Sequence, residues 1–339
     1  MVTEPFTAFR IHRDDGRITA ALEQLKIDDL TPGDVVVAVG YSSINYKDAL
    51  AATGRGSILR RFPLVGGIDL AGEIVESSDP DWPAGTPVIV CGAGLSETRD
   101  GGFAEYARVA SDALVLMPRG LDARSAMAIG TAGFTAALAI DRLEHNGQRP
   151  DLGPVAVTGA SGGVGSMAVD MLASRGYEVM AVTGKREAAD YLRALGASAI
   201  VERTELATST KPLESARFGG AIDSLGGEAL ATLLKSTRPH GNVASIGLAA
   251  SPELNTTVLP FILRGVNLLG INSVDLSQAV RQTLWDRLAG DLKPKQLARI
   301  ASREISLDDL PTHFADYIDA RVTGRTIVAI GARDRYAPG

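Results

Sequence analysis

The sequence predicts a two-domain α/β protein in which a small β-barrel precedes a doubly wound parallel sheet. The chain has 339 residues, more than one hydrophobic core usually accommodates. Residues 1–128 carry many short strand patterns separated by turns, whereas residues 150–272 alternate between strand and helix patterns. Where the alternation begins, residues 155–166 read VAVTGASGGVGS, a β-branched run followed by closely spaced glycines.

Composition argues against several classes of protein. The formal net charge of −6 argues against a nucleic-acid-binding protein. No apolar run is predicted to span a membrane, and the first 13 residues lack a signal-peptide core, so we expect a cytoplasmic protein without a membrane partner. A single cysteine, Cys91, and four scattered histidines argue against a disulfide and a zinc site, so no metal is expected.

The first domain is predicted from alternating and β-branched runs. Strands are expected at 6–11, 18–22, 34–39, 70–75, 87–91 and 103–109. The segment 42–50, SSINYKDAL, places polar residues between a strand and a short helix. It is either part of a functional site or a helix cap with solvated Lys47 and Asp48. A long alanine-rich helix over 123–143 is expected to link the two domains.

The second domain is predicted from alternating elements. Strands are expected at 155–158, 178–182, 199–202, 220–225, 242–247 and 266–271, with helices near 163–175, 186–195 and 227–237. The remaining chain is expected to form a helix over 277–290, a strand over 304–307 and a helix near 308–321. A last strand over 324–330 is expected to return to the first domain.

The glycine-rich turn predicts a dinucleotide site. Gly159 allows a sharp turn off the strand, Gly162 and Gly163 allow backbone N–H groups to approach a pyrophosphate, and Gly165 allows the helix to pack on the sheet. The helix N-terminus adds unpaired N–H groups and the positive end of a dipole. The alternative is a glycine-rich turn in an unrelated α/β protein.

The end of the next strand predicts which nicotinamide cofactor binds. NAD-specific folds place a carboxylate there to bind the adenine ribose. Here the strand ends in Thr183, Gly184 and Lys185, and Arg203 follows the third strand. Cations without a carboxylate would attract a 2′-phosphate, which predicts NADPH. The alternative is that Lys185 and Arg203 are solvated surface charges.

Taken together, these residues resemble the medium-chain dehydrogenase/reductase superfamily. Within it they resemble the zinc-independent, quinone-oxidoreductase-like branch that includes NADPH-dependent acrylyl-CoA reductases. The matching stretches are SSINYKDAL (42–50), GIDLAG (67–72), GTAGFTA (130–136), VTGASGGVGS (157–166), PFILR (260–264) and GRT (324–326). The resemblance implies a GroES-like barrel domain over 1–128, completed by 300–339, a Rossmann domain over 129–299, and a homodimer.

The resemblance also implies the site residues. Its implied cofactor contacts are Tyr46, Ser161, Gly162, Gly163, Val164, Thr183, Gly184, Lys185, Arg203, Leu248, Ile262, Ser273 and Arg325. Zinc members carry Gly-His-Glu where this chain has Gly67, Ile68 and Asp69. Two departures stand out: Gly66 replaces a usual proline, and the segment 91–102, which borders the substrate cleft in the family, lacks its usual tryptophans.

The implied reaction is reduction of the C=C bond of a 2-enoyl-CoA, with acrylyl-CoA as the expected substrate. Hydride adds to the β-carbon and a proton to the α-carbon, with Tyr46 as the candidate donor and Asn45 and Thr131 in support. Arg55, Arg60 and Arg61, joined by Arg264, are candidates for binding the CoA phosphates; the alternative is a solvated basic loop. Two other functions remain open: an NADPH-dependent quinone or enone oxidoreductase, and a non-catalytic NADPH-binding sensor.

Overall fold

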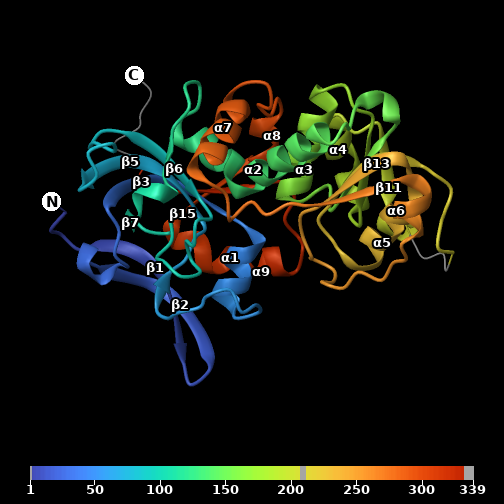
Figure 1. Ribbon diagram of the computed structural model, residues 1–339. Helices are drawn as coiled ribbons and strands as arrows, with labels where there is room; N and C mark the ends of the chain where they lie inside the picture. Colours follow the sequence, from blue (N-terminus) through green and yellow to red (C-terminus); the bar gives the residue numbers. More distant parts are fainter. Residues whose placement is uncertain (1, 207–210, 332–339) are drawn as a thin grey trace. The chain divides into compact units, whose positions relative to one another are not determined.

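The computed structural model describes residues 2–206 and 211–331, which form two compact units (Figure 1). Within the described chain, unit 1 comprises 2–131, 274–291 and 297–331, and unit 2 comprises 132–206, 211–273 and 292–296. The segment 274–291 packs with unit 1, although the sequence division places it in the second domain.

Unit 1 is built from two sheets. The smaller sheet has the order β2-β1-β4, with β1 (Phe6–Asp14), β2 (Arg17–Leu25) and β4 (Leu64–Val65). The larger sheet has the order β15-β16-β3-β5-β6-β8, and β7 also pairs with β3. Its strands are β3 (Val35–Ile44), β5 (Asp69–Ser77), β6 (Pro87–Cys91), β7 (Tyr106–Val109), β8 (Val115–Leu116), β15 (Arg303–Ser306) and β16 (Thr326–Ala329). The helices are α1 (Tyr46–Thr53), α7 (Gln278–Ala289), α8 (Leu297–Ile300) and α9 (Leu310–Ile318).

The last strand returns to unit 1, as the sequence predicts. β16 pairs antiparallel with β3, with Thr326 opposite Ile44, and β15 runs parallel to β16. α9 packs against α1, and Phe314 of α9 lies 5.5 Å from the ring of Phe9 in β1. The C-terminal segment therefore contributes both to the sheet and to the core beneath α1, and it places Arg325 beside the end of β3.

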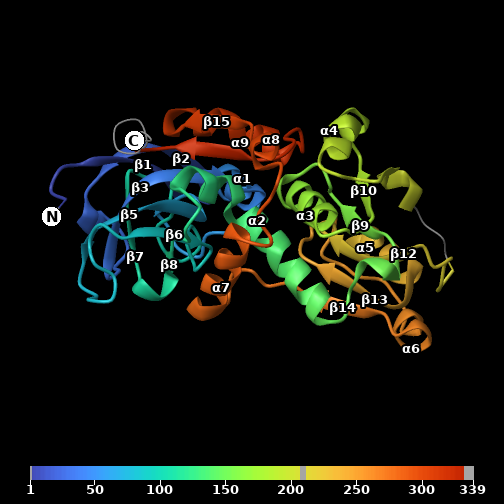
Figure 2. The same ribbon diagram turned by 90° about the horizontal axis from the view of Figure 1, so that it is seen from above.

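Unit 2 is a six-stranded parallel sheet, which confirms the predicted doubly wound fold (Figure 2). The order is β11-β10-β9-β12-β13-β14, so the winding direction changes between β9 and β12, where dinucleotides bind in such sheets. The strands are β9 (Val155–Thr158), β10 (Val179–Thr183), β11 (Ala199–Glu202), β12 (Phe218–Asp223), β13 (Thr237–Ser245) and β14 (Asn267–Gly270). The helices are α3 (Gly163–Ser174), α4 (Ala189–Ala194), α5 (Gly227–Ser236) and α6 (Leu259–Arg264).

The long helix α2 (Ala123–His145) contributes residues to both units. By length and composition alone it could cross a membrane, a criterion that buried core helices also meet. However, 83% of its most apolar window is buried within the protein, as in a core helix. Its backbone also leaves helical geometry at Gly130, where φ is +52° and ψ is −163°.

Candidate active site

The strand-to-helix turn of unit 2 depends on glycine. Gly159 follows β9 with φ of +59°, a left-handed conformation that favours glycine. A Cβ on Gly165 would lie 2.3 Å from the carbonyl oxygen of Gly159 and 2.6 Å from the Cα of Ala160. The close neighbour of Gly165 is thus the turn itself, rather than the sheet as the sequence predicts. α3 begins tight against the turn, and its first N–H groups lack helical acceptors and can bind an anion.

Two hydroxyl groups connect this turn to the neighbouring strand. Ser161 Oγ and Thr183 Oγ1 lie 3.2 Å apart, and Thr183 Oγ1 accepts a hydrogen bond of 3.0 Å from the backbone N–H of Lys185. Ser161 lies in the turn after β9, and Thr183 ends β10. The structure therefore brings Ser161, Thr183, Gly184 and Lys185 together at the carboxyl ends of two adjacent parallel strands.

Cations and carboxylates meet at this edge of the sheet. β10 and β11 pair in parallel with Thr183 opposite Glu202, so Lys185 and Arg203 follow neighbouring strand ends. The carboxylate of Glu202 is bound by Arg186, with Nε–Oε1 at 2.5 Å and Nη2–Oε2 at 2.8 Å. Arg203 is exposed. Glu205 adds a second carboxylate, whose Oε1 accepts a hydrogen bond of 3.0 Å from the backbone N–H of Glu202. Lys185 and Arg203 are therefore cations suited to a phosphate at an edge that also carries carboxylates.

Two other predicted cofactor residues of unit 2 follow strand ends. Leu248 comes after β13 and is 65% exposed. Ser273 comes after β14, and its Oγ accepts a hydrogen bond of 2.9 Å from Thr135 Oγ1. Both residues therefore lie after carboxyl ends of strands in the same parallel sheet.

The structure separates Ile262 and Arg264 from these residues. Both lie on α6, and Arg264 donates hydrogen bonds to the carbonyl oxygens of Lys235, Thr237 and Glu214. Because Thr237 begins β13, α6 lies near the amino end of that strand, opposite the edge with the glycine turn. The guanidinium of Arg264 is bound to backbone carbonyl oxygens at that end of the sheet. The cofactor contact expected of Ile262 and the phosphate contact expected of Arg264 stay predictions.

Asp69 is the centre of a buried polar network in unit 1. Its Oδ2 accepts hydrogen bonds from Ser43 Oγ (2.8 Å), Asn45 Nδ2 (2.8 Å) and the backbone N–H of Thr131 (3.0 Å). Its Oδ1 accepts a hydrogen bond from Thr131 Oγ1, and Arg325 forms an ion pair with Oδ2 at 3.6 Å. The side chain of Asp69 is fully buried, so these donors replace water around its charge.

The side chain of Arg325 binds acceptors within unit 1. Its guanidinium, 2% exposed, offers five N–H donors. Besides Asp69, its acceptors are Ala128 O (3.4 Å), Ile44 O (3.1 Å), Asn45 Oδ1 (2.8 Å) and Ser43 Oγ (2.6 Å). These contacts show that the side chain fixes the end of β3 and the amide of Asn45. The cofactor contact expected of Arg325 stays a prediction.

Gly130 makes room for this network. A Cβ there would lie 2.4 Å from Arg325 Nη2 and 2.7 Å from Asp69 Oδ2. The break in α2 at Gly130 also allows the N–H of Thr131 to reach Asp69. The sequence predicts an uninterrupted helix over 123–143, and the helix is interrupted where the buried ion pair needs the space.

Tyr46 begins α1 directly after Asn45. It is 44% exposed, and its hydroxyl has no hydrogen-bond partner among the described residues. The next residue, Lys47, pairs with Glu97. Of the three predicted catalytic residues, Asn45 and Thr131 therefore bind the buried Asp69, while Tyr46 is open to a ligand.

Asp48 forms a capping box with Asn45, as the alternative of a helix cap predicts, but it is buried rather than solvated. Its carboxylate accepts hydrogen bonds from the backbone N–H groups of Asn45 (2.8 Å) and Ile68 (3.0 Å). Burial, assisted by the charge of Asp69, raises the pKa of Asp48 to about 7. Burial and Asp69 likewise raise the pKa of the Cys91 thiol, so this cysteine stays protonated and is a poor nucleophile.

The predicted basic loop lies after α1. Arg55, Arg60 and Arg61 are exposed, and their side chains have no ion-pair partner among the described residues. The backbone N–H of Arg60 donates to Glu97 O at 2.8 Å, which ties this loop to the segment that also binds Lys47. The structure therefore brings these three arginines into one surface loop, without Arg264.

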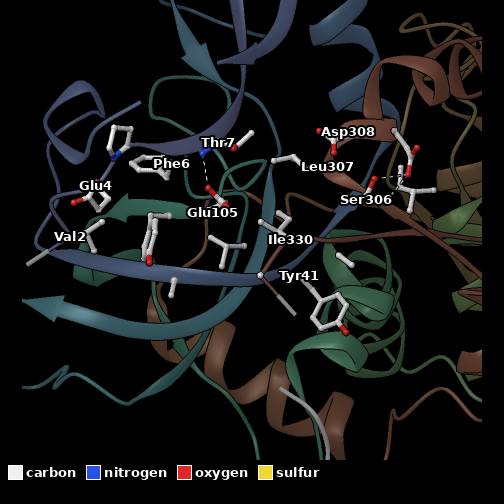
Figure 3. A pocket seen from close by; sticks show the side chains of 18 of the residues that line it. Val2, Glu4, Phe6, Thr7, Tyr41, Glu105, Ser306, Leu307, Asp308 and Ile330 are labelled. Atoms are coloured by element: carbon white, nitrogen blue, oxygen red, sulfur yellow. Dashed lines mark hydrogen bonds between the residues drawn. The ribbon is translucent and has the colours of Figure 1, made fainter. Parts of the chain in front are cut away.

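A cavity of about 1070 Å³ elsewhere in unit 1 is not this site (Figure 3). Its lining includes Glu4, Glu105 and Asp308, and no predicted site residue is among its lining in the part of the chain that the structure describes. Figure 3 shows Glu105 directed at Thr7, whose backbone N–H donates to it at 2.6 Å. This carboxylate therefore holds β1 in place.

Comparisons with known proteins agree with this geometry. Residues 31–119 match the model of the alcohol dehydrogenase GroES-like domain, and residues 163–290 match that of the zinc-binding dehydrogenase. The chain is 47% identical over 330 residues to acrylyl-CoA reductase AcuI of Ruegeria pomeroyi, covering 96% of this chain and 100% of that protein.

The chain belongs to the medium-chain dehydrogenase/reductase superfamily, in its quinone-oxidoreductase-like branch.

Two solved structures of this branch are similar over nearly the whole chain. Escherichia coli K-12 YhdH, with bound NADPH, has a TM-score of 0.92 and 47% identity, covering 95% of this chain and 99% of that one. Bacillus subtilis YhfP, with NAD bound, has a TM-score of 0.94 and 46% identity, covering 96% and 100%. YhfP is provisionally named a quinone oxidoreductase.

The buried network includes the position at which the resemblance implies metal ligands in zinc members. Where zinc members carry His and Glu, this chain has Ile68 and Asp69, and Asp69 is bound by Arg325. Within residues 2–206 and 211–331, no group of three or more His, Cys, Asp or Glu side chains can hold a metal ion.

Asp69 was not predicted as a site residue, and Ser43 and Asp48 were predicted only as members of the candidate segment 42–50. All three lie within the stretches quoted for the resemblance, and a carboxylate at the position of the metal-site Glu is the signal that points to Asp69. Its function depends on Arg325, which is 256 positions further along the chain, so no local pattern reveals the pair.

The pKa of Asp48 predicts a pH dependence of stability. Because its pKa rises from 3.8 to about 7 on folding, the folded state binds more protons than the unfolded state between these values. The free energy of unfolding should therefore fall as pH rises from about 4 to about 7, by up to about 4 kcal/mol from this group. Urea unfolding of wild type and Asp48→Asn across this range tests the prediction.

The wild type should lose stability relative to Asp48→Asn as pH rises. Parallel stability curves, together with a carboxyl carbon of Asp48 that titrates near pH 4 by NMR, would contradict the assignment.

Proposed function

We propose that this protein is an NADPH-dependent reductase of 2-enoyl-CoA thioesters that converts acrylyl-CoA to propanoyl-CoA. The observation that carries the proposal is 47% identity to acrylyl-CoA reductase AcuI over 96% of this chain and all of that protein. Because the match covers 96% of this chain, it extends over both units.

The cofactor site fits a phosphorylated dinucleotide. The glycine turn after β9 has no space for a Cβ at Gly165, and the helix N-terminus beside it suits a pyrophosphate. Lys185 and Arg203 follow adjacent strand ends, where an NAD-specific fold would place a carboxylate. Bound NADPH in YhdH agrees with NADPH here, and the cation pair favours it over the NAD bound in YhfP.

We propose that Tyr46 acts on the reacting thioester. When bound, NADPH supplies a hydride for the β-carbon of the conjugated thioester. Negative charge then builds on the thioester oxygen, and a fixed donor stabilises it most when it needs no reorganisation. The Tyr46 hydroxyl can donate a hydrogen bond to that oxygen or a proton to the α-carbon. Asn45 and Thr131 act through Asp69, which fixes the start of α1.

Arg325 is a positioning residue in this proposal. It binds Asn45 Oδ1 while Asp69 binds Asn45 Nδ2, so the amide before Tyr46 is held from both sides. Such a doubly held amide limits the motion of the first turn of α1. The remaining proposed contacts are those of Arg55, Arg60 and Arg61 with the phosphates of CoA, for which exposed guanidinium groups are suited.

A second candidate is a quinone or enone oxidoreductase. The provisional name of YhfP, 46% identical over 96% of this chain, favours it. It uses the same cofactor site and Tyr46 but needs no phosphate-binding arginines, because a free quinone carries no phosphate.

We also propose a cytoplasmic homodimer. β14 ends the parallel sheet as its outer strand, and Leu268 on it is 37% exposed. On the neighbouring α6, Ile262 and Leu263 are 67% and 64% exposed. An apolar helix beside an unpaired strand edge suits self-association, and a monomer mass in light scattering would refute the dimer.

The substrate assignment is tested by NADPH oxidation with acrylyl-CoA, crotonyl-CoA and a benzoquinone measured in parallel. The expected result is the highest kcat/KM with acrylyl-CoA. The Arg60→Ala, Arg61→Ala double variant should raise KM for acrylyl-CoA about tenfold and leave KM for the quinone unchanged, since charge-assisted hydrogen bonds are lost only for CoA. A preference for the quinone with no response to the arginines would favour the second candidate.

The cofactor assignment is tested by the ratio of kcat/KM for NADPH to that for NADH. The ratio should exceed one in the wild type and fall about tenfold in Lys185→Ala, because a charge-assisted contact to the 2′-phosphate is lost. Arg193→Ala, which removes an exposed cation of α4 paired with Asp190, is the matched control and should leave the ratio unchanged. A wild-type ratio below one would refute the assignment.

A further inference from the structure

The guanidinium of an arginine lies over an aromatic ring next to the basic loop. The guanidinium carbon of Arg13 is 4.5 Å from the centroid of Phe62, the residue after Arg61. Arg13 is exposed and Phe62 is half-buried, packed against the core that includes Phe9 and Phe314. The guanidinium therefore makes a cation–π contact with the ring, and the side chain remains open to solvent.

The β1–β2 hairpin turns Arg13 toward the basic loop. Arg13 pairs directly with Ile18 across the hairpin, and paired residues share one face. A Cβ on Gly54 would lie 3.0 Å from Ile18, so this face touches the start of the loop that carries Arg55. In Figure 1 the hairpin, in dark blue, extends away from the rest of unit 1, with α1 beside it.

The loop runs back along α1. Arg55 lies just past the C-terminal end of α1, and the backbone N–H of Gly56 donates to Leu50 O. Arg60 is tied through Glu97 to Lys47 in the first turn of the helix. With 8 residues, α1 is about 12 Å long, and Tyr46 is its first residue. Cations therefore extend from the neighbourhood of Tyr46 to the far end of α1.

We propose that Arg13 is a stacking platform for the adenine ring of CoA, with the CoA phosphates on Arg55 and Arg61. The inference rests on the proposed function. The thioester lies at Tyr46, the pantetheine arm follows α1, and the nucleotide reaches the cations beyond it. The cation–π contact with Phe62 limits the freedom of the guanidinium, which lowers the entropic cost of a further contact, and arginine planes stack on nucleobases.

The hairpin offers a matched control. Arg17 is also exposed but pairs with Asp14, the neighbouring rung of the ladder, so it lies on the opposite face from Arg13. Loss of Arg17 changes the net charge by the same amount as loss of Arg13. A general electrostatic effect should therefore be the same for both variants. Loss of a stacking contact should affect only the Arg13 variant.

The experiment compares acrylyl-CoA with acrylyl-N-acetylcysteamine, which carries the same reacting group without the nucleotide. Arg13→Ala and Arg13→Lys should both raise KM for acrylyl-CoA at least about fivefold, because lysine keeps the charge but has no plane to stack. KM for the truncated thioester, KM for NADPH and kcat should not change, and Arg17→Ala should behave as wild type. Calorimetric titration of the NADPH complex with CoA should show the same loss of affinity.

The outcomes separate the two proposals. Wild-type activity on both thioesters with no response to Arg13 would overturn the stacking platform alone. Full rescue by Arg13→Lys would also overturn it, since charge would then suffice. A raised KM for NADPH would assign the platform to the other nucleotide and overturn it for CoA. A wild type that neither binds CoA nor reduces acrylyl-CoA would overturn the proposed function and the platform together.

Discussion

The structure of unit 1 depends on the buried ion pair between Asp69 and Arg325. Two charges in an apolar interior are costly unless every donor and acceptor is matched, and here Ser43, Asn45 and Thr131 complete the set. Removing one partner of such a pair typically costs about 3–5 kcal/mol, because the other charge remains buried. The pair therefore specifies one arrangement of the segments that meet at it.

Those segments are far apart in the sequence. The end of β3, the start of β5, the break in α2 and the residue before β16 all contribute to the network. The network fixes the start of α1, because Asp69 and Arg325 both bind the side-chain amide of Asn45, the residue before Tyr46. In unit 2 the structural constraint is on the backbone: the dinucleotide turn needs the positive φ of Gly159 and the absence of a Cβ at Gly165. In our proposal, the charges of Lys185 and Arg203 then select among ligands.

The parts of this protein that follow local rules were predictable from sequence. The strands 155–158 and 199–202 and the glycine turn have the periodicity and glycine spacing of a nucleotide-binding sheet, and they form as expected. The break at Gly130 was not predictable, because the surrounding alanine-rich pattern is helical and the cause is a guanidinium from the C-terminal segment. The roles of Arg325 and Arg264 also depended on distant partners. The donors of Arg325 bind the buried network, and those of Arg264 bind carbonyl oxygens near the start of β13.

The central claim is that the buried network positions Tyr46 for the reaction. The most direct test is a double-mutant cycle of kcat with acrylyl-CoA, using Tyr46→Phe and Asp69→Asn, with circular dichroism to confirm folding of each variant. The account predicts that each change lowers kcat at least about tenfold, and that the double variant is no slower than the slower single variant, because both changes remove the same donor. Full activity of Tyr46→Phe, or effects that multiply in the double variant, would contradict it.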